Sequence, residues 1–276
     1  MEGAIRSEMS VSDRILNPSL IVFTGVLSLY IFNLVAGLAV EEFNVWLHIP
    51  LFVLQVLLSI LMFTPLHDAV HKTANKNRLV NELMMHGTWI FFLNAPMVFR
   101  KIHLAHHAHT NQGEDDPDHF TSANTWLGRW LKSFLLIFSY YNYAIRKFKR
   151  TPENFFWLGS SFMVLVIAYL SLFIVDNPLQ LLFVWQLPAF VGIGFLGFLN
   201  TAWPHHPGKD ASRYGNTKIL KVWKPLEWLL LYQNYHLVHH LRPQLPWYRY
   251  TSYWKEHQEE ILAQGAEILD YRQKGC

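Results

Sequence analysis

The sequence predicts an all-α integral membrane protein in which four transmembrane helices form two hairpins beneath a helical cap. Three observations support this fold class. Of the 276 residues, 51% are hydrophobic and only 16% are charged, whereas a soluble domain carries about 25% charged residues. Four apolar stretches are long enough to cross a bilayer, which takes about 20 residues. Three clusters of histidines lie just outside these stretches.

The four apolar stretches contain no Lys, Arg, Asp or Glu. They cover residues 20–40, 43–66, 155–175 and 179–203. A helix of about 21 residues, rising about 1.5 Å per residue, is about 31 Å long and matches the hydrocarbon thickness of a bilayer. The alternative is a set of buried helices in a large soluble protein, and the lack of charge in all four stretches argues against it.

The positions of the basic residues predict the orientation in the membrane. Of 23 Lys and Arg residues, 2 precede the first span, 11 lie in 67–154 and 10 follow Trp203. The two short links that join the spans of each hairpin contain none. Since basic segments stay on the cytoplasmic side, we expect both termini to be cytoplasmic. The cap, formed by 67–154 and 204–276, then lies on that side of a single multi-pass domain, 1–276.

Composition excludes several other classes of protein. A formal net charge of +3 gives a nucleic-acid partner no electrostatic support. The single cysteine, Cys276, excludes an internal disulfide and a cysteine-based metal cluster. The N-terminal segment shows no apolar run followed by a small-residue cleavage site, so we expect no cleaved signal peptide. The chain has no Gly-x-Ser-x-Gly motif, and its Gly-x-Gly-x-x-Gly sequence at 192–197 lies within the fourth apolar stretch instead of between a strand and a helix, so we expect reducing electrons to come from an external donor.

Three smaller features lead to local predictions. The apolar run 88–99 is too short to span and contains Asn94 and Pro96, so we expect a half-helix in the membrane interface. Segment 252–272 spaces its apolar residues like an amphipathic helix. His48 lies near the outer end of the second span, where an interfacial side chain that reaches toward water is expected.

Three histidine motifs predict a metal centre held by the cap. They read "HDAVH" at 67–71, "HLAHH" at 103–107 and "HLVHH" at 236–240. Spacings of three and four residues place the imidazoles on one face of a helix, and neutral imidazole is the commonest metal ligand, suited to Fe, Zn, Cu or Ni. One such motif alone is often polar surface, but three on one side of a membrane are not. The predicted ligands are His67, His71, His103, His106, His107, His236, His239 and His240.

The number of histidines indicates two metal ions. Eight ligands are twice what a tetrahedral site uses. His205 is a ninth candidate, because it follows Pro204 at the end of the fourth span. His206 can take its place, and the sequence does not separate the two; a helix-end cap is the alternative for both.

Carboxylates follow the second motif in the segment "NQGEDDPDHF". Asp115, Asp116 and Asp118 can accept a hydrogen bond from the outer nitrogen of a metal-bound imidazole and so orient it. The alternative is a solvated acidic turn around Pro117. Five further residues next to the predicted ligands are assigned the same supporting role: Asp68, Asn234, His86, His109 and His206.

Other metal chemistries fit the motifs less well. An intramembrane zinc protease carries His-Glu-x-x-His with Glu as general base, but Asp68 occupies the Glu position here and the additional histidines would have no role. A soluble di-iron bundle uses Glu-x-x-His pairs, and the chain has none. A non-enzymatic histidine-rich metal transporter or sensor would need polar residues along its spans.

Together the motifs and spans resemble the membrane fatty-acid desaturase and hydroxylase superfamily, over roughly 45–255. The longer segments "HDAVHKTANKNRLVNELMMHG", "HLAHHAHTNQGEDDPDHF" and "NYHLVHHLRPQLPWYRY" are most similar to cyanobacterial-type β-carotene hydroxylases. The resemblance implies a non-haem di-iron centre held by histidine, with two iron ions and O2 as co-substrate. It also implies an electron donor such as ferredoxin or cytochrome b5.

One departure from those enzymes concerns the fourth span. They tend to read Pro-His-Arg-Pro after it, whereas this chain reads Pro204-His205-His206-Pro207. His205 keeps the matching position, which favours it as the ligand, while His206 can alter the pocket or the donor surface.

The expected function is therefore O2-dependent oxidation of an unactivated C–H bond in an apolar lipid, with hydroxylation of a carotenoid ring such as that of β-carotene favoured. Fatty acyl desaturation is the first alternative, since removal of a second hydrogen gives an alkene instead of an alcohol. A non-enzymatic metal-binding membrane protein is a remote one.

Overall fold

The computed structural model describes residues 17–207, 210–270 and 272, and it confirms an all-α membrane fold in which a cap holds a cluster of histidines. The N-terminal segment on which the signal-peptide expectation depends lies mainly outside the described residues, as does Cys276.

Four helical segments are long and apolar enough to cross a membrane. The first hairpin consists of α3 (Pro18–Leu38) and α4 (Val45–Val70), and the second begins with α10 (Pro152–Ser171). The fourth span is composite: α11 (Pro178–Leu181), the π-helix η3 (Leu182–Gln186), α12 (Leu187–Leu196) and the π-helix η4 (Gly197–Ala202). Its two wide turns have no signature in the apolar pattern of the sequence.

The helix boundaries follow from capping. Asn17, Asn44, Thr151 and Asn177 each accept a backbone N–H of the first turn with a side-chain oxygen, as N-cap residues do. α4 continues past the predicted end at 66, so His67 lies within the helix.

Two polar side chains inside the spans donate hydrogen bonds to backbone carbonyls of neighbouring helical segments. Asn33 donates to the carbonyl of Leu51 at 3.0 Å, and Gln55 donates to that of Val184 at 2.8 Å. Such bonds are required where no water is present. They fix α3 against α4, and α4 against the fourth span.

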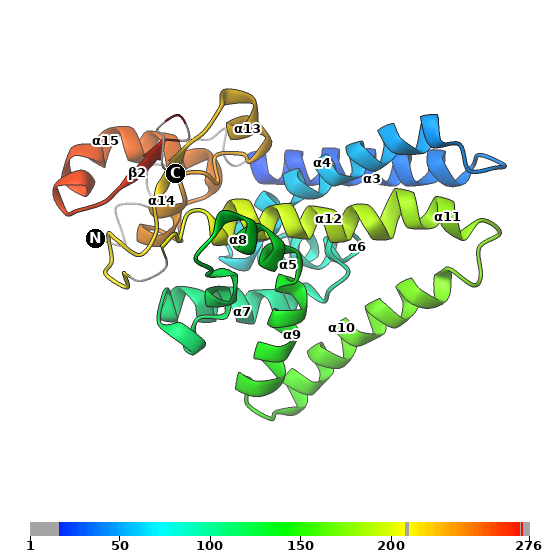
Figure 1. Ribbon diagram of the computed structural model, residues 1–276, viewed down its shortest axis with the longest axis horizontal. Helices are drawn as coiled ribbons and strands as arrows, with labels where there is room; N and C mark the ends of the chain where they lie inside the picture. Colours follow the sequence, from blue (N-terminus) through cyan, green and yellow to red (C-terminus); the bar gives the residue numbers. More distant parts are fainter. Residues whose placement is uncertain (1–16, 208–209, 271, 273–276) are drawn as a thin grey trace.

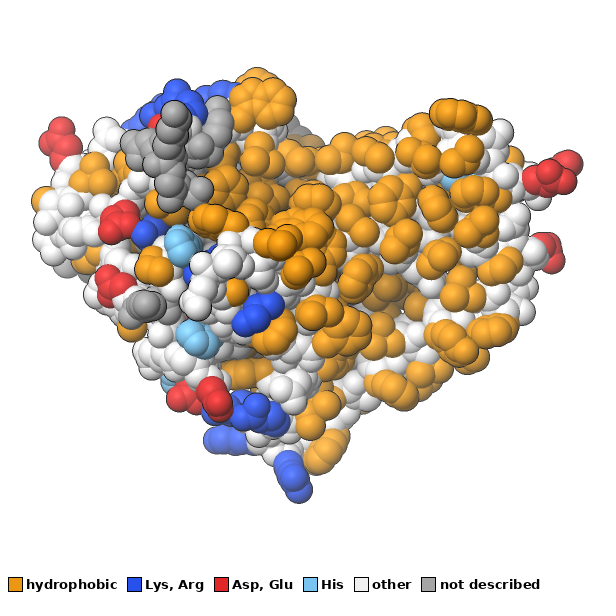
Figure 2. All heavy atoms as spheres, viewed as in Figure 1, with side chains coloured by type: hydrophobic (Ala, Val, Ile, Leu, Met, Phe, Trp, Pro, Cys, Tyr) orange, Lys and Arg blue, Asp and Glu red, His pale blue; other side chains and the backbone are white. Residues whose placement is uncertain are grey.

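α10 is packed less tightly than the other spans. Figure 1 shows α3, α4 and α12 running side by side while α10 diverges from them. In the most apolar 18-residue stretch of α10, only 11% is buried, compared with 50% in the corresponding stretch of α4. Most of the surface of α10 therefore faces lipid. Figure 2 shows the corresponding hydrophobic surface over the spans, with Lys, Arg and His gathered on the opposite half of the molecule.

The cap has two parts. The first lies between the hairpins and comprises α5 (Arg78–His86), α6 (Trp89–Phe92), α7 (Pro96–His109), the 3-10 helices η1 (Gly113–Asp115) and η2 (Pro117–Thr121), α8 (Trp126–Phe134) and α9 (Leu136–Lys147). The second follows the fourth span and comprises β1 (Ile219–Lys221), α13 (Lys224–Leu229), α14 (His236–Leu241), the 3-10 helix η5 (Trp247–Arg249), α15 (Tyr250–Ala263) and β2 (Ile268–Asp270).

The prediction of a continuous helix over 252–272 is wrong at its C-terminal end. α15 stops at Ala263, and Gly265 adopts a left-handed conformation with φ of 91°, which glycine tolerates without strain. The chain then forms β2, which pairs in parallel with β1, Ile268 opposite Ile219. Two of the apolar residues assigned to the helix, Ile268 and Leu269, therefore belong to a strand.

Two other local predictions need correction. The run 88–99 is not one helix: α6 ends after four residues, Leu93 adopts φ of 47°, and α7 begins at Pro96. His48 is not interfacial but fully buried, with its Nε2 3.1 Å from the carbonyl oxygen of Gly37. Gly37 lies near the end of α3, and Phe43 of the loop that closes the first hairpin packs against the imidazole with ring centres 4.6 Å apart.

Candidate metal centre

Four segments bring histidines to one place in the cap. The end of α4 supplies His67 and His71, and α7 supplies three histidines from successive turns. His205 follows η4 directly, and the short helix α14 supplies the last three. All nine histidines that the sequence analysis assigned as ligands lie together here.

The histidines form two groups of four. One ring nitrogen from each member lies within 4.8 Å of the others. The first group is His67, His71, His103 and His239; the second is His106, His205, His236 and His240. The Nε2 atom of His107 lies 3.1 Å from that of His103 and 2.7 Å from that of His239, while its ring is centred 4.4 Å from that of His240. His107 therefore lies between the groups.

The nitrogen spacing fits a metal ion. Two nitrogens held tetrahedrally at about 2.1 Å from one ion are about 3.4 Å apart. In the second group, the Nε2 of His236 lies 3.2 Å from that of His205 and 3.2 Å from that of His240. The Nε2 atoms of His106 and His240 are 3.3 Å apart. Each group can thus hold one ion.

Unpaired nitrogens point to the same conclusion. Both ring nitrogens of His67 are buried without a hydrogen-bond partner among the described residues. Buried polar atoms normally have a partner, and a metal ion supplies one that the protein chain does not.

Burial keeps most of these imidazoles neutral. It lowers the pKa of His71 to about 4, with a contribution from Arg100, and lowers that of His205 to about 3, with a contribution from His106. The pKa values of His236 and His240 are also well below the ordinary value, for burial first and then the charges of neighbouring histidines. A neutral imidazole has a free lone pair for a metal.

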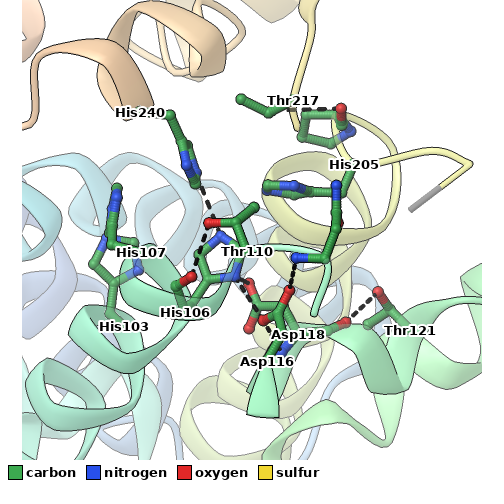
Figure 3. A network of polar contacts seen from close by, with 12 residues as sticks. His103, His106, His107, Thr110, Asp116, Asp118, Thr121, His205, Thr217 and His240 are labelled. Carbon is green, nitrogen blue, oxygen red and sulfur yellow. Dashed lines mark hydrogen bonds and ion pairs between the residues drawn. The ribbon is translucent and has the colours of Figure 1, made fainter. Parts of the chain in front are cut away.

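His106 differs because it faces carboxylates. Burial alone would lower its pKa, but Asp118 and Asp116 raise it to about 9. Its Nδ1 donates to Asp116 Oδ1 at 2.8 Å, and Asp118 Oδ2 lies at 3.5 Å (Figure 3). Asp116 itself accepts the N–H of Asn111 at 2.7 Å. The carboxylates hold the proton on Nδ1, so Nε2 is the nitrogen directed at the metal, which would displace the Nε2 proton on binding.

Other histidines are oriented by partners that the sequence analysis missed. The Nδ1 of His205 lies 3.0 Å from the carbonyl oxygen of Asn216, and the Nδ1 of His239 lies 3.2 Å from the hydroxyl of Tyr250. Tyr140 donates to Asp118 at 2.6 Å. Tyr250 ends the "PWYRY" segment, which was the one available signal; the other two contacts depend on the tertiary fold.

The remaining supporting candidates have other partners. Asp68 accepts from the Ser19 hydroxyl at 2.9 Å, Asp115 pairs with Lys147 at the surface, and Asn234 donates to the carbonyl of Leu220.

Three histidines assigned the same role have partners of other kinds. His86 stacks on Trp157, and His109 lies at the surface beside Gln112. His206 packs against Trp126 with ring centres 4.9 Å apart, so His205 and not His206 faces the cluster.

An apolar cavity leads from the histidines into the membrane region. It reaches His103, His106 and His236. Its remaining walls come from seven helical elements and the segment before α7. They are Phe63, Leu66, Phe92, Asn94, Pro96, Phe99, Asp118, Leu136, Ile137, Tyr140, Ile193, Leu196, Gly197, Asn200 and Thr201. A few polar groups in an otherwise apolar wall are typical of a site that binds and orients a lipid.

Comparison with known proteins agrees with this arrangement. The model of the fatty acid desaturase family matches residues 44–272. A β-carotene ketolase of Paracoccus sp. (strain N81106 / MBIC 01143) is 28% identical over 202 residues, which cover 71% of this chain and 74% of that protein. A β-carotene ketolase of Paracoccus sp. (strain PC1) is 26% identical over 202 residues, covering 70% and 73%. These relatives are ketolases, whereas the motifs suggested hydroxylases.

Proposed function

Because the chain belongs to the fatty acid desaturase family, we propose that it is a di-iron, O2-dependent enzyme that oxidises a ring carbon of a carotenoid. The observation that carries this proposal is the pair of histidine groups that opens onto an apolar cavity. The first expected product is an alcohol, formed by hydroxylation of that carbon. The two relatives are named ketolases, which suggests a second oxidation at the same carbon. That step converts the alcohol to a ketone with loss of water.

The ligand set suits iron of this kind. Nine imidazoles without a thiolate favour Fe, Zn, Cu or Ni over Mg or Ca, and two ions account for two groups of four better than a single zinc does. When bound, the two irons would supply the activation of O2 that an unactivated C–H bond requires. The electrons would come from an external donor such as ferredoxin or cytochrome b5.

The protein's own residues position the reactants. His103, His106 and His236 form one end of the cavity, so a lipid that fills the apolar part presents its end to both histidine groups. Asp116 keeps the proton of His106 on Nδ1. The apolar walls exclude water from the reacting carbon, which protects it from side reactions.

The test is expression in a bacterium that accumulates β-carotene, followed by pigment chromatography. We expect a new, more polar carotenoid with the wild-type chain and none with His239→Ala, because one group then has three ligands. His119→Ala is the matched control: this histidine is exposed, and the product should be unchanged.

Two outcomes would contradict the proposal. No new carotenoid together with a changed unsaturation profile of the membrane lipids would favour the fatty acyl desaturase, the alternative that the family match supports. Purified protein should contain about two irons per chain, and iron-free protein with one zinc would favour a metal-binding protein without this activity.

A further inference from the structure

Asn94 lies in the cavity at a distance from the histidines. It belongs to the short break between α6 and α7, next to the left-handed Leu93. Its side chain is only 6% exposed and forms part of the wall together with Phe92 and Ile193. From Pro96 to His103, α7 rises about 10 Å, so Asn94 and the metal centre lie on the order of 10 Å apart along the cavity.

A chain of hydrogen bonds fixes which way the amide of Asn94 points. The backbone N–H of Ala95 donates to the Ser161 hydroxyl at 3.0 Å. Since that oxygen accepts, its own hydrogen is donated onward, to Asn94 Oδ1 at 2.8 Å. The Tyr141 hydroxyl lies 3.5 Å from the same Oδ1. The carbonyl oxygen of the amide is thus turned toward α10 and α9, and the NH2 group, on the other branch of the amide, points away from them.

The NH2 group of Asn94 makes no hydrogen bond to any residue that the structure describes. An unpaired donor held against apolar walls is unfavourable, and a ligand that brings an acceptor removes this penalty. The cavity walls contain no Lys or Arg, and Asp118 is their one ionisable carboxyl group. The surroundings therefore fit a neutral oxygen and disfavour a carboxylate.

We propose that Asn94 is a specificity residue that donates a hydrogen bond to a hydroxyl or carbonyl oxygen of the bound lipid. This inference rests on the proposed function and narrows its substrate class. The preferred lipid already carries a neutral oxygen on the same end group, within about 10 Å of the carbon to be oxidised. A pure hydrocarbon binds less tightly, because it leaves the donor unpaired.

The test measures binding and needs no turnover. Purified protein in detergent is incubated with equal amounts of β-carotene and a hydroxylated β-carotene, recovered by gel filtration and extracted. Pigment chromatography then gives the ratio of the two retained lipids. We expect the wild-type chain to enrich the hydroxylated lipid about tenfold, as one additional hydrogen bond of about 1.4 kcal/mol would.

Variants identify the residue responsible. Asn94→Leu removes the donor and keeps the branched outline of the side chain, so the ratio should fall toward one while β-carotene is retained as before. Ser161→Ala leaves the donor but releases its orientation, so the enrichment should fall by a smaller factor. Gln186→Leu is the matched control: this amide donates to the carbonyl of Ala168 at 2.6 Å and is not part of the cavity wall, and the ratio should match the wild type.

The wild-type ratio tests the inference even if a variant fails to fold. A wild-type ratio near one overturns it, as does full enrichment in Asn94→Leu. If carotenoid oxidation occurs but no enrichment is found, this inference alone fails. If neither lipid is retained, the proposed function fails as well.

Discussion

Asp116 joins the metal centre to the surface loop that follows α7. Its Oδ1 accepts from His106 and from the backbone N–H of Asp118 at 2.9 Å, and its Oδ2 accepts from the N–H of Asn111. The carboxylate is thus fixed by the backbone before it meets the imidazole. The negative charge makes His106 a more basic metal ligand.

We expect Asp116→Asn to lower iron affinity by about 10- to 100-fold, since the amide keeps the shape but loses the charge. The measurement is iron content per chain after dialysis against a graded series of chelator concentrations. Asp115→Asn is the control, because Asp115 pairs with Lys147 at the surface. Equal iron loss from both variants would show that the charge beside His106 has no special role.

Sequence reasoning identified the histidines that cluster in the cap but not most of their hydrogen-bond partners. Spacing of three and four residues reveals His103 and His106 because one helix presents both on the same face. The contact of His205 with the carbonyl of Asn216 has no such signal, since it depends on how the chain folds after the fourth span. In the sequence, Asn94 stands out only as an interruption of an apolar run.

At the scale of the helices, α5 and α7 both bind the C-terminal end of α4 through the backbone carbonyl of Ala69. Arg100 of α7 donates to the carbonyl oxygen of Ala69 at 2.8 Å, and Asn81 of α5 donates to the same oxygen at 2.9 Å. Arg100 also makes two bonds to Glu82, at 2.8 and 2.9 Å. The last carbonyls of a helix lack partners within it, so this arrangement satisfies one of them and ties the first histidine motif to the second.

We expect Arg100→Met to lower the free energy of unfolding by about 1–3 kcal/mol, because it leaves a buried carbonyl with one donor fewer and Glu82 without its partner. Thermal unfolding in detergent is the measurement. Lys101→Met is the control on the same helix, since Lys101 bonds Glu153 at the surface, and it should shift the midpoint much less. Similar shifts in both variants would contradict a role for the Ala69 contact.

The elements that were predicted well are those governed by local pattern. The spans followed from runs of apolar residues. Their observed starts are set by the N-cap residues Asn17 and Asn44, a local signal that the apolar runs alone do not include. The two π-helices, the break at Leu93 and the pairing of β2 with β1 did not follow, because they depend on contacts between distant segments. Ile268 suits a helix or a strand equally until its partner is known.

At the scale of the whole molecule, the links between the spans and the cap differ in charge. The link between α3 and α4 contains Glu41 and Glu42, the link after α10 contains Asp176, and neither contains Lys or Arg. The cap contains nearly all the basic residues. By the positive-inside rule, we propose that the cap and the histidines face the cytoplasm.

Cysteine labelling tests this orientation. In a Cys276→Ser background, Glu42→Cys should react with a membrane-impermeant maleimide in intact cells, whereas Lys255→Cys on α15 should react only after lysis. Both cysteines should react in detergent, which controls for exposure of the side chains. The reverse pattern would place the metal centre on the outer side.

The loose packing of α10 has a consequence for exchange with the bilayer. This helix has the most lipid-exposed surface of the four spans, and it also supplies Ser161, which holds the Asn94 amide. A sideways displacement of α10 would withdraw the Ser161 hydroxyl and so release the Asn94 amide, which forms part of the cavity wall. The thickness and chain order of the surrounding lipid would therefore influence which molecules are admitted, as well as how quickly they enter.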